Sequence, residues 1–379
     1  MHLIFYPKNE LKPVGGSAGY LFNLSKGLSD SEFDFLPDSR INIPYYSKYK
    51  KFIPKVVLDY RRALYMLKEI NNENPKPDTI EEYDCIHFNS TLSMYVNRKW
   101  LDSYKGKVIL TSHSPCALHR EMIDQLDKRV YRLLKSKLDS MSKFDEYAFR
   151  RADAVIFPTE YSEEPYFNTW DNYKNIRDAK KNKYMASGLA ARCAAKESRN
   201  VIRKKYGIPQ DAFLISYVGR HNEIKGFDVL KSIGQDLIKE NIWVIVAGKN
   251  EPIKGLENPH WIEVGWTNDP HSIMAASDLF ILPNKETYFD LVLLEAISLG
   301  IPCLISNTGG NKFFKNYEKT GIMLFESIGE AEEKIKQFRE IDFDSKCELK
   351  EKLITLFNDE FSLIPFVNRY KKTIDEILE

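Results

Sequence analysis

Short apolar runs recur along most of this chain. Longer stretches, in which the apolar residues have helical spacing, separate these runs. Uninterrupted apolar strands that alternate with helices are typical of parallel sheets covered on both faces. The pattern therefore predicts two doubly wound α/β domains, one from each series of runs. The runs are "HLIFY" (2–6), "DCIHF" (84–88), "KVILTSHS" (107–114) and "DAVIFPT" (153–159), then "FLISYVG" (213–219), "IWVIVAG" (242–248), "DLFILP" (278–283) and "PCLISN" (302–307).

A polar stretch separates the two series. Residues 161–205 lose the strand rhythm, and we expect the interdomain connection there. The expected domains are residues 1–185 and residues 200–361. Because ligands of such sheets bind beyond the carboxyl ends of the strands, the cleft between the two sheets is the expected site.

Length and composition narrow the class. A chain of 379 residues exceeds the size of most single cores. Its net charge of +1 gives no overall field that would favour nucleic acid. The five scattered cysteines form no CxxC pair, which indicates a reducing compartment and no cysteine-built zinc site. The short apolar run before Pro7 and the lack of an apolar stretch of about 18 residues predict a cytosolic protein.

Two glycine-containing turns are candidate phosphate sites. In "PVGGSAGYLFNLSKGL" (13–28), Gly15 and Gly16 precede a helix whose N–H groups can bind an anion. The alternative is a plain turn, and the spacing is not GxGxxG, so no nicotinamide cofactor is inferred. In "SYVGRHNEIKGFDVL" (216–230), Arg220 and Lys225 flank a strand-to-helix loop, which suits a diphosphate. The alternative there is a pair of solvated surface charges.

A carboxylate stands in the apolar segment "PNKETYFDLVLLEAISLG" (283–300). If a helix begins near Asp290, Glu295 shares its face with mostly apolar neighbours such as Leu291 and Leu299. An unpaired buried carboxylate costs several kcal/mol, so a polar partner is expected.

These segments together carry a family resemblance. "VGRHNEIKGFDVL", "VIVAGKNE", "VGWTNDPHSIMAASDLFILPNKE" and "YFDLVLLEAISLGIPCLISNTGG" resemble the C-terminal domain of family 4 glycosyltransferases. The Gly15–Gly16 loop, "YDCIHFNS" (83–90) and "ILTSHSP" (109–115) resemble the acceptor-side domain, so the resemblance covers nearly the whole chain. It implies the α/β GT-B fold: two Rossmann-like domains facing across a cleft, with a C-terminal helix (about 362–379) that crosses back to the first domain.

The resemblance also implies roles in donor binding. Arg220 and Lys225 would neutralise the diphosphate of a nucleotide-sugar. Glu295 would accept hydrogen bonds from the ribose, and the helix start near Leu291 would direct N–H groups toward the phosphates. The loop next to the donor would contain Gly309 and Gly310.

Two histidines receive different expectations. His113 follows "VILTS" at a strand end and resembles the family's histidine near the transferred sugar; a structural role is the alternative. His87 lies within "DCIHF" and is expected to be structural.

The acidic pair departs from the family pattern. The family has two glutamates separated by seven residues, and that spacing before Glu295 falls on Thr287. Either Thr287 acts through its hydroxyl, or a loop shift lets Glu286 reach the sugar; Glu286 is the favoured alternative. Residues 288–290 (Tyr-Phe-Asp) replace the family's "GFG".

A basic and aromatic stretch, residues 45–62, is a candidate membrane contact. It holds six cations against one acid, interleaved with four tyrosines and a phenylalanine. Such stretches favour anionic membranes by roughly 1 kcal/mol per cation. The alternative is an ordinary solvated helix face. The charged residues are Lys48, Lys50, Lys51, Lys55, Arg61, Arg62 and Asp59.

The resulting hypothesis is a retaining glycosyltransferase. It would move a sugar from a nucleotide diphosphate sugar, with UDP favoured, to a hydroxyl of a glycan or lipid-linked saccharide in surface polysaccharide biosynthesis. No metal or other cofactor and no nucleic-acid partner are expected; "DFD" (342–344) lies between helical patterns and is expected to cap a helix. The alternatives are a phosphorylase or sugar-nucleotide epimerase on the same scaffold, and a non-catalytic partner protein.

Overall fold

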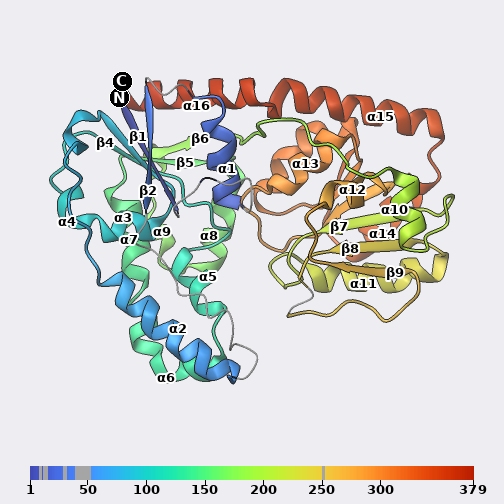
Figure 1. Cartoon of the computed structure of the whole chain (residues 1–379), viewed down its shortest axis with the longest axis horizontal. Coiled ribbons are helices and arrows are strands. Elements are labelled where there is room, and N and C mark those ends of the chain that lie inside the picture. The colour runs from blue at the N-terminus through green and yellow to red at the C-terminus, as the bar shows by residue number, and fades with distance from the viewer. Residues whose placement is uncertain (8–10, 12–15, 29–31, 39–52, 250–251) are drawn as a thin grey trace. The chain divides into compact units, whose positions relative to one another are not determined.

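The computed structural model describes the chain except residues 8–10, 12–15, 29–31, 39–52 and 250–251. It forms two compact units, each built around its own sheet (Figure 1). Unit 1 comprises Met1–Pro158, Glu163–Ala186 and Val367–Glu379, and unit 2 comprises Thr159–Ser162 and Ser187–Phe366.

Unit 1 contains a six-stranded parallel sheet in the order β2-β1-β3-β4-β5-β6. Its strands are β1 (His2–Pro7), β2 (Phe33–Asp38), β3 (Cys85–Phe88), β4 (Lys107–Leu110), β5 (Ala154–Phe157) and β6 (Asn182–Tyr184). Its helices are α1 (Gly16–Ser25), α2 (Lys55–Ile70), α3 (Thr91–Val96), α4 (Arg98–Leu101), α5 (Leu118–Asp124), α6 (Lys128–Asp139), α7 (Ser142–Arg151), α8 (Glu164–Thr169) and α9 (Tyr173–Ile176), together with most of α16 (Leu363–Leu378).

Unit 2 repeats this architecture, with a parallel sheet in the order β12-β11-β10-β7-β8-β9. Its strands are β7 (Leu214–Val218), β8 (Trp243–Ala247), β9 (Trp261–Gly265), β10 (Leu279–Leu282), β11 (Cys303–Ser306) and β12 (Ile322–Phe325). Its helices are α10 (Arg199–Lys205), α11 (Phe227–Leu237), α12 (Pro270–Ala275), α13 (Leu291–Leu299), α14 (Ile328–Arg339) and α15 (Phe343–Leu356), with the 3₁₀ helix η6 (Gly309–Thr320) and the π-helix η7 (Phe357–Phe361).

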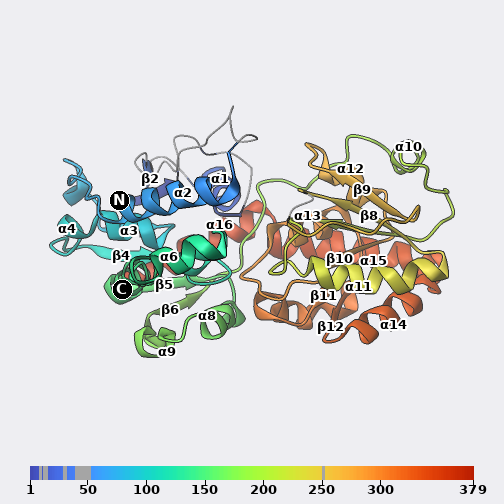
Figure 2. The same ribbon diagram turned by 90° about the horizontal axis from the view of Figure 1, so that it is seen from below.

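Helices cover both faces of the unit 2 sheet. Helices α11 and α14 pack on one face, and α10 and α12 pack on the other; Figures 1 and 2 both show α11 and α12 on opposite sides of β8 and β9. Successive residues of β8 divide accordingly: Val244 and Val246 pack with α11 and α14, whereas Ile245 packs with α10 and α12. Strands buried on both faces need apolar residues at every position, which explains the uninterrupted runs in the sequence.

The eight strands predicted from the apolar runs are all present, so the predicted fold class is confirmed. Four further strands were not predicted: β2, β6, β9 and β12. These are the outer strands of the two sheets. In β6 and β9 most side chains are partly or fully exposed, because an edge strand has only one neighbouring strand and less helix cover. Their sequences therefore lack the continuous apolar signal.

The polar stretch 161–205 is more structured than its composition indicated. It contains α8, α9, β6 and α10, and the chain passes from unit 1 to unit 2 between Ala186 and Ser187. Helices α8 and α9 are only six and four residues long, too short to display a helical period. The "DFD" segment caps a helix as expected, because Asp342 accepts a hydrogen bond of 2.8 Å from the Ser345 N–H at the start of α15.

His87 ties the C-terminal helix into the core of unit 1. Its Nδ1 lies 2.9 Å from the Tyr370 hydroxyl on α16, and its Nε2 lies 2.9 Å from the Thr111 hydroxyl. Burial lowers the pKa of His87 to about 3, so the ring is neutral at physiological pH. Both ring nitrogens are satisfied inside the protein, in agreement with the expected structural role.

We expect the stability of unit 1 to fall as the pH is lowered, in part because of His87. The unfolded ring takes up a proton below about pH 6.5, whereas the folded ring stays neutral down to about pH 3. Between pH 7 and pH 5 this histidine should remove at most about 2 kcal/mol of unfolding free energy.

The variant His87→Gln isolates this contribution. It should lower stability at pH 7 by about 1 to 3 kcal/mol through a lost buried hydrogen bond. It should also reduce the further loss of stability between pH 7 and pH 5. Urea unfolding of the wild type and the variant at the two pH values measures both effects. Equal pH dependence in the two proteins would show that His87 does not carry the effect.

Candidate functional site

Three loops of unit 2 meet at the carboxyl edge of its sheet. They follow β7, β10 and β11, and the strand order reverses between β7 and β10. The Lys285 N–H donates to the Ile224 carbonyl at 3.0 Å, and the Thr308 hydroxyl donates to the Lys285 carbonyl at 3.0 Å. Such a reversal of strand order is where ligands bind in doubly wound sheets.

Gly226 permits the closest approach between the first two loops. Its φ is +63°, in the left-handed region, and it is the N-cap of α11. A Cβ at this position would stand 1.7 Å from the carbonyl oxygen of Pro283. Only glycine combines a left-handed backbone with so close an approach. Its neighbour Lys225 is thereby brought to the β10 loop.

Lys225 forms an ion pair with Asp290, the N-cap residue of α13. The Lys225 Nζ lies 2.5 Å from one carboxylate oxygen of Asp290. The other oxygen accepts hydrogen bonds from the Asn284 amide and, at 3.2 Å, from the Thr287 hydroxyl. Burial by itself would raise the pKa of Asp290, but the Lys225 charge and these hydrogen bonds lower it below its ordinary value. The site therefore contains a charged, firmly held carboxylate.

Sequence reasoning did not select Asp290. The available signal was its position, since an acid directly before the apolar run of α13 occupies the N-cap. Its carboxylate does not cap the helix, because it is turned toward Lys225. No local pattern predicts that contact, which joins residues 65 positions apart.

The two candidates for the first acidic position differ in burial. Thr287 is fully buried and its hydroxyl donates to Asp290. Glu286 is partly exposed, and its N–H lies 3.4 Å from the Ile224 carbonyl. Of the two, Glu286 is thus the residue with a solvent-accessible side chain at this edge.

Glu295 has a polar partner, His271 at the start of α12. The helix predicted near Asp290 begins at Leu291, and Glu295 lies one turn into it. Its Oε2 lies 3.4 Å from the His271 Nε2, and the two side chains are 28% and 29% exposed. Hydrogen bonding to Cys193 and to Glu295 raises the pKa of His271 to about 10, despite an opposing effect of burial. The ring is therefore positively charged, and sequence reasoning had not selected it.

The glycine pair after β11 lies directly against the β10 loop. Gly309 and Gly310 are buried at the start of η6. The Gly310 N–H donates to the Thr287 carbonyl at 3.1 Å, and a Cβ at Gly310 would stand 2.0 Å from the Tyr288 carbonyl oxygen.

Arg220 is exposed after β7, and its carbonyl accepts a 2.7 Å hydrogen bond from the Tyr217 hydroxyl. The eight unit 2 candidates thus all belong to these three loops and to α13.

His113 lies at the carboxyl end of β4 in unit 1. Its Nε2 is 2.7 Å from Asn89 Oδ1, and the Asn89 amide donates to the Phe5 carbonyl at 3.0 Å. Burial lowers the pKa of His113 to about 3, so the ring is neutral and carries its proton on Nε2. Its φ of +56° is uncommon for a residue other than glycine, and such conformations cluster at functional sites.

The two candidate glycines of unit 1 have different outcomes. Gly16 is the first residue of α1, and space is open around the position that its Cβ would take. Gly15 lies outside the described residues.

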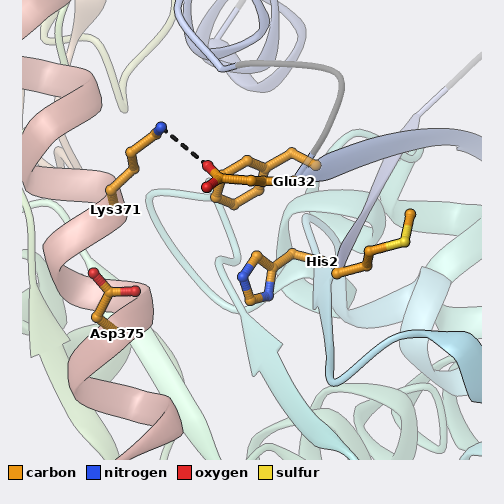
Figure 3. Close-up of a pocket in the computed structure, with 6 residues that line it drawn as sticks. His2, Glu32, Lys371 and Asp375 are labelled. Carbon is orange, nitrogen blue, oxygen red and sulfur yellow. Dashed lines mark hydrogen bonds and ion pairs between the residues drawn. The ribbon is translucent and has the colours of Figure 1, made fainter.

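A cavity in unit 1 lies at the opposite, amino edge of its sheet, where β1 and β2 begin (Figure 3). Its volume is about 250 Å³, below the roughly 300 to 1,000 Å³ of ligand pockets. Lys371 and Glu32 pair across its rim at 3.2 Å. Neither its size nor its position is that of a donor site. Among the described residues, no three His, Cys, Asp or Glu side chains cluster as metal ligands.

The fold is that of a doubly wound α/β protein, with Arg220 and Lys225 on the loop at the strand reversal. Residues 198–355, within unit 2, match the family model described as glycosyl transferases group 1. Over this segment, which is less than half of the chain, the protein is similar to the group 1 glycosyltransferases, in agreement with the family resemblance predicted from the sequence.

A curated relative supports this assignment over part of the chain. It is the Escherichia coli UDP-Gal:alpha-D-GlcNAc-diphosphoundecaprenol alpha-1,3-galactosyltransferase, 31% identical over 135 residues. The match covers 32% of this chain and 35% of that protein.

Solved structures match the whole chain in fold. Sucrose-phosphate synthase from Thermosynechococcus elongatus has a TM-score of 0.64 at 16% identity, over 99% of this chain and 98% of that one. Anabaena HepE in complex with UDP and glucose has a TM-score of 0.62 at 14% identity, over 98% and 99%. The GT-B fold predicted from the sequence is thereby confirmed.

We expect Gly310→Ala to destabilise unit 2 by about 1 to 3 kcal/mol, because the added methyl group would overlap the Tyr288 carbonyl. Gly329→Ala in α14 is the matched control. No atom lies within 4 Å of its added Cβ, so it should be neutral or stabilise by up to about 1 kcal/mol. Urea unfolding compares the two. Equal stability in both variants would mean that residues 309–310 and 287–288 do not pack as described.

Proposed function

We propose that this protein is a retaining glycosyltransferase. It transfers a sugar from a nucleotide diphosphate sugar, with a UDP-sugar favoured, to a hydroxyl of a glycan or lipid-linked saccharide in surface polysaccharide biosynthesis. The observation that carries the proposal is the Lys225–Asp290 pair at the start of α13, beside the Arg220 loop. The names of the E. coli relative and of the HepE complex support a uridine donor.

Diphosphate binding is proposed to replace one ion pair by another. Lys225 already holds a carboxylate, and a phosphate oxygen can take that place because both are anions with similar hydrogen-bonding geometry. Arg220 supplies a second, exposed cation on the same loop. Both cations stabilise the negative charge that grows on the diphosphate as the bond to the sugar breaks, which is why we propose no metal requirement.

The rest of the donor is proposed to lie along α13. Glu295, partly exposed one turn from the helix start, accepts hydrogen bonds from the ribose hydroxyls. The free N–H groups near Leu291 direct the positive end of the helix dipole toward the phosphates. Glu286 is the proposed acidic contact of the sugar, because Thr287 is buried. Gly309 and Gly310 keep the neighbouring loop close to the donor.

Transfer is proposed to proceed without a covalent enzyme intermediate. The acceptor hydroxyl attacks from the face that the diphosphate leaves, so the configuration of the sugar is retained. His113 is proposed to contact the transferred sugar as a neutral ring, which its lowered pKa keeps neutral across physiological pH. Its left-handed backbone conformation supports a functional placement.

A membrane contact is proposed for the α2–α6 surface, defined by the exposed residues of these two helices. The helices pack together through residues such as Ala63 and Val130 (Figure 1). Helix α6 carries five basic residues against one acid. The exposed side chains include apolar Val57, Tyr60, Leu64 and Leu133 beside basic Lys55, Arg61, Lys68, Lys128, Arg129, Arg132, Lys135 and Lys137.

This composition suits the interface of an anionic bilayer, where a lipid-linked acceptor is held. Leu133, which is 72% exposed, contributes to the apolar part of this surface together with Val57, Tyr60 and Leu64. Of the predicted stretch 45–62, residues 45–52 lie outside the described part, whereas Lys55, Arg61 and Arg62 lie on α2. Within the described residues, no helix is both long enough and apolar enough to cross a bilayer.

We expect two substitutions of the central ion pair to change nucleotide affinity in opposite directions. Lys225→Ala removes the cation and should weaken UDP binding at least tenfold, as for the loss of a charge-assisted hydrogen bond of about 1.5 to 3 kcal/mol. Asp290→Asn removes the competing anion and should strengthen UDP binding by a few fold. Calorimetric titration with UDP measures both.

Lys239→Ala is the control, because Lys239 is 73% exposed and pairs only with the nearby Asp236 among the contacts described. Absence of UDP binding to the wild-type protein would favour the non-catalytic partner protein. Weaker binding by Asp290→Asn would mean that the carboxylate orients Lys225 and does not compete. A panel of nucleotide-sugars, followed by nucleotide release with acceptors, separates transfer from phosphorolysis and epimerisation.

We expect the double variant Arg61→Glu/Arg132→Glu to lose binding to anionic vesicles. Neutralising two cations at the interface should remove about 2 kcal/mol of binding free energy, which is close to a thirtyfold loss in partitioning to the vesicles. Reversing their charge should increase this loss. Sedimentation with phosphatidylglycerol vesicles measures it, with phosphatidylcholine vesicles and the exposed unit 2 variant Lys204→Glu as controls. Unchanged sedimentation of the double variant would exclude the α2–α6 surface as the contact.

A further inference from the structure

We propose that His271 is a positioning residue for nucleotide recognition: it holds the Glu295 carboxylate in one orientation for the ribose hydroxyls. The inference rests on the proposed function, because Glu295 is the ribose contact there. It adds a residue whose contribution acts through Glu295. The observation that carries it is the 3.4 Å approach of the His271 Nε2 to the Glu295 Oε2, between α12 and α13 of one unit.

The backbone of His271 is firmly fixed. Pro270 occupies the first turn of α12, and the N-cap Asp269 accepts a hydrogen bond of 3.2 Å from the Ser272 N–H. The Ser272 hydroxyl, which is fully buried, accepts hydrogen bonds of 2.9 Å from the N–H groups of Lys196 and Glu197. The start of α12 is therefore attached both to its own cap and to the chain segment before α10.

The other two members of the contact are fixed relative to each other. The Ser298 hydroxyl donates to the Glu295 carbonyl at 2.7 Å and accepts from the Cys193 N–H at 3.2 Å. Cys193 thus lies beside α13, and its thiol is close enough to His271 to raise the pKa of that ring. Cys193 and Glu295 therefore both act on the His271 ring, and the segments that carry these two residues are joined through Ser298.

The exposure of the pair permits a ligand to reach it. About seven-tenths of each side chain is covered, which limits the alternative rotamers, and the remainder is accessible. A glutamate without a partner on this mostly apolar face would have several rotamers available, and ordering it on binding would cost entropy. An adjacent cation reduces that cost in advance, and the raised pKa of His271 keeps the cation charged through physiological pH.

The proposal and a purely structural role predict different results with a nucleotide that lacks ribose hydroxyls. If His271 only supports packing, its replacement should weaken UDP and 2′,3′-dideoxy-UDP to the same extent. If it positions Glu295, the loss should appear with UDP alone. The informative quantity is therefore the preference, the ratio of the two dissociation constants.

The experiment is calorimetric titration of the full chain with UDP and with 2′,3′-dideoxy-UDP. Wild type should prefer UDP at least tenfold, and Glu295→Gln should abolish most of that preference. His271→Gln should reduce it to about twofold or less, with dideoxy-UDP affinity changed by less than twofold. His271→Lys retains a cation and should recover part of the preference. His260→Gln, at the amino end of β9 and stacked on Trp243, is the matched control and should change nothing.

Three results would overturn the inference. One is a full UDP preference in His271→Gln, and another is an equal loss of both nucleotides. The third is a wild-type preference that Glu295→Gln leaves intact, which would remove Glu295 from ribose recognition while donor binding stands. Failure of the wild type to bind either nucleotide would instead overturn the proposed function, and this inference with it. Thermal unfolding of each variant verifies that it is folded. If His271→Gln does not fold, His271→Lys takes its place in the comparison.

Discussion

The ion pair between Lys225 and Asp290 is the contact on which the candidate site depends. It closes the gap between the loops after β7 and β10, at the point where the strand order reverses. Gly226 makes this closure possible, because any side chain there would overlap the Pro283 carbonyl. Through Asp290 the pair fixes the start of α13, and the orientation of that helix in turn brings Glu295 beside His271.

The histidines and the aspartate described above differ in their charge state. In unit 1, His87 and His113 are neutral because burial lowers their pKa values and their partners are uncharged groups. In unit 2, Asp290 and His271 are charged because each faces a group of opposite charge. Under the proposed function such ion pairs would favour donor binding, because the incoming diphosphate would replace an internal anion beside a cation that is already desolvated.

The interior of each sheet was predictable, and its edges were not. The strands β1, β3, β4 and β5, and likewise β7, β8, β10 and β11, are covered on both faces and have continuous apolar sequences. Edge strands such as β6 and β9 are partly exposed, so their residues resemble those of loops. The same reasoning located Arg220, Lys225 and Glu295, because charged residues next to apolar strands or within an apolar helix stand out in a linear pattern.

Local patterns in the sequence were sufficient to predict the α/β class, the two series of strands and the charged residues that follow some of those strands, because periodicity and burial leave a local pattern of apolar residues. The contacts between side chains became apparent only in the folded chain. Asp290 contacts Lys225, Thr287 turns inward to the same carboxylate, and Glu295 lies beside His271. Such pairings depend on the order of the strands in the parallel sheet. A change of one residue in a loop can also turn a side chain away from a ligand and toward a neighbouring residue. Local patterns do not encode that geometry.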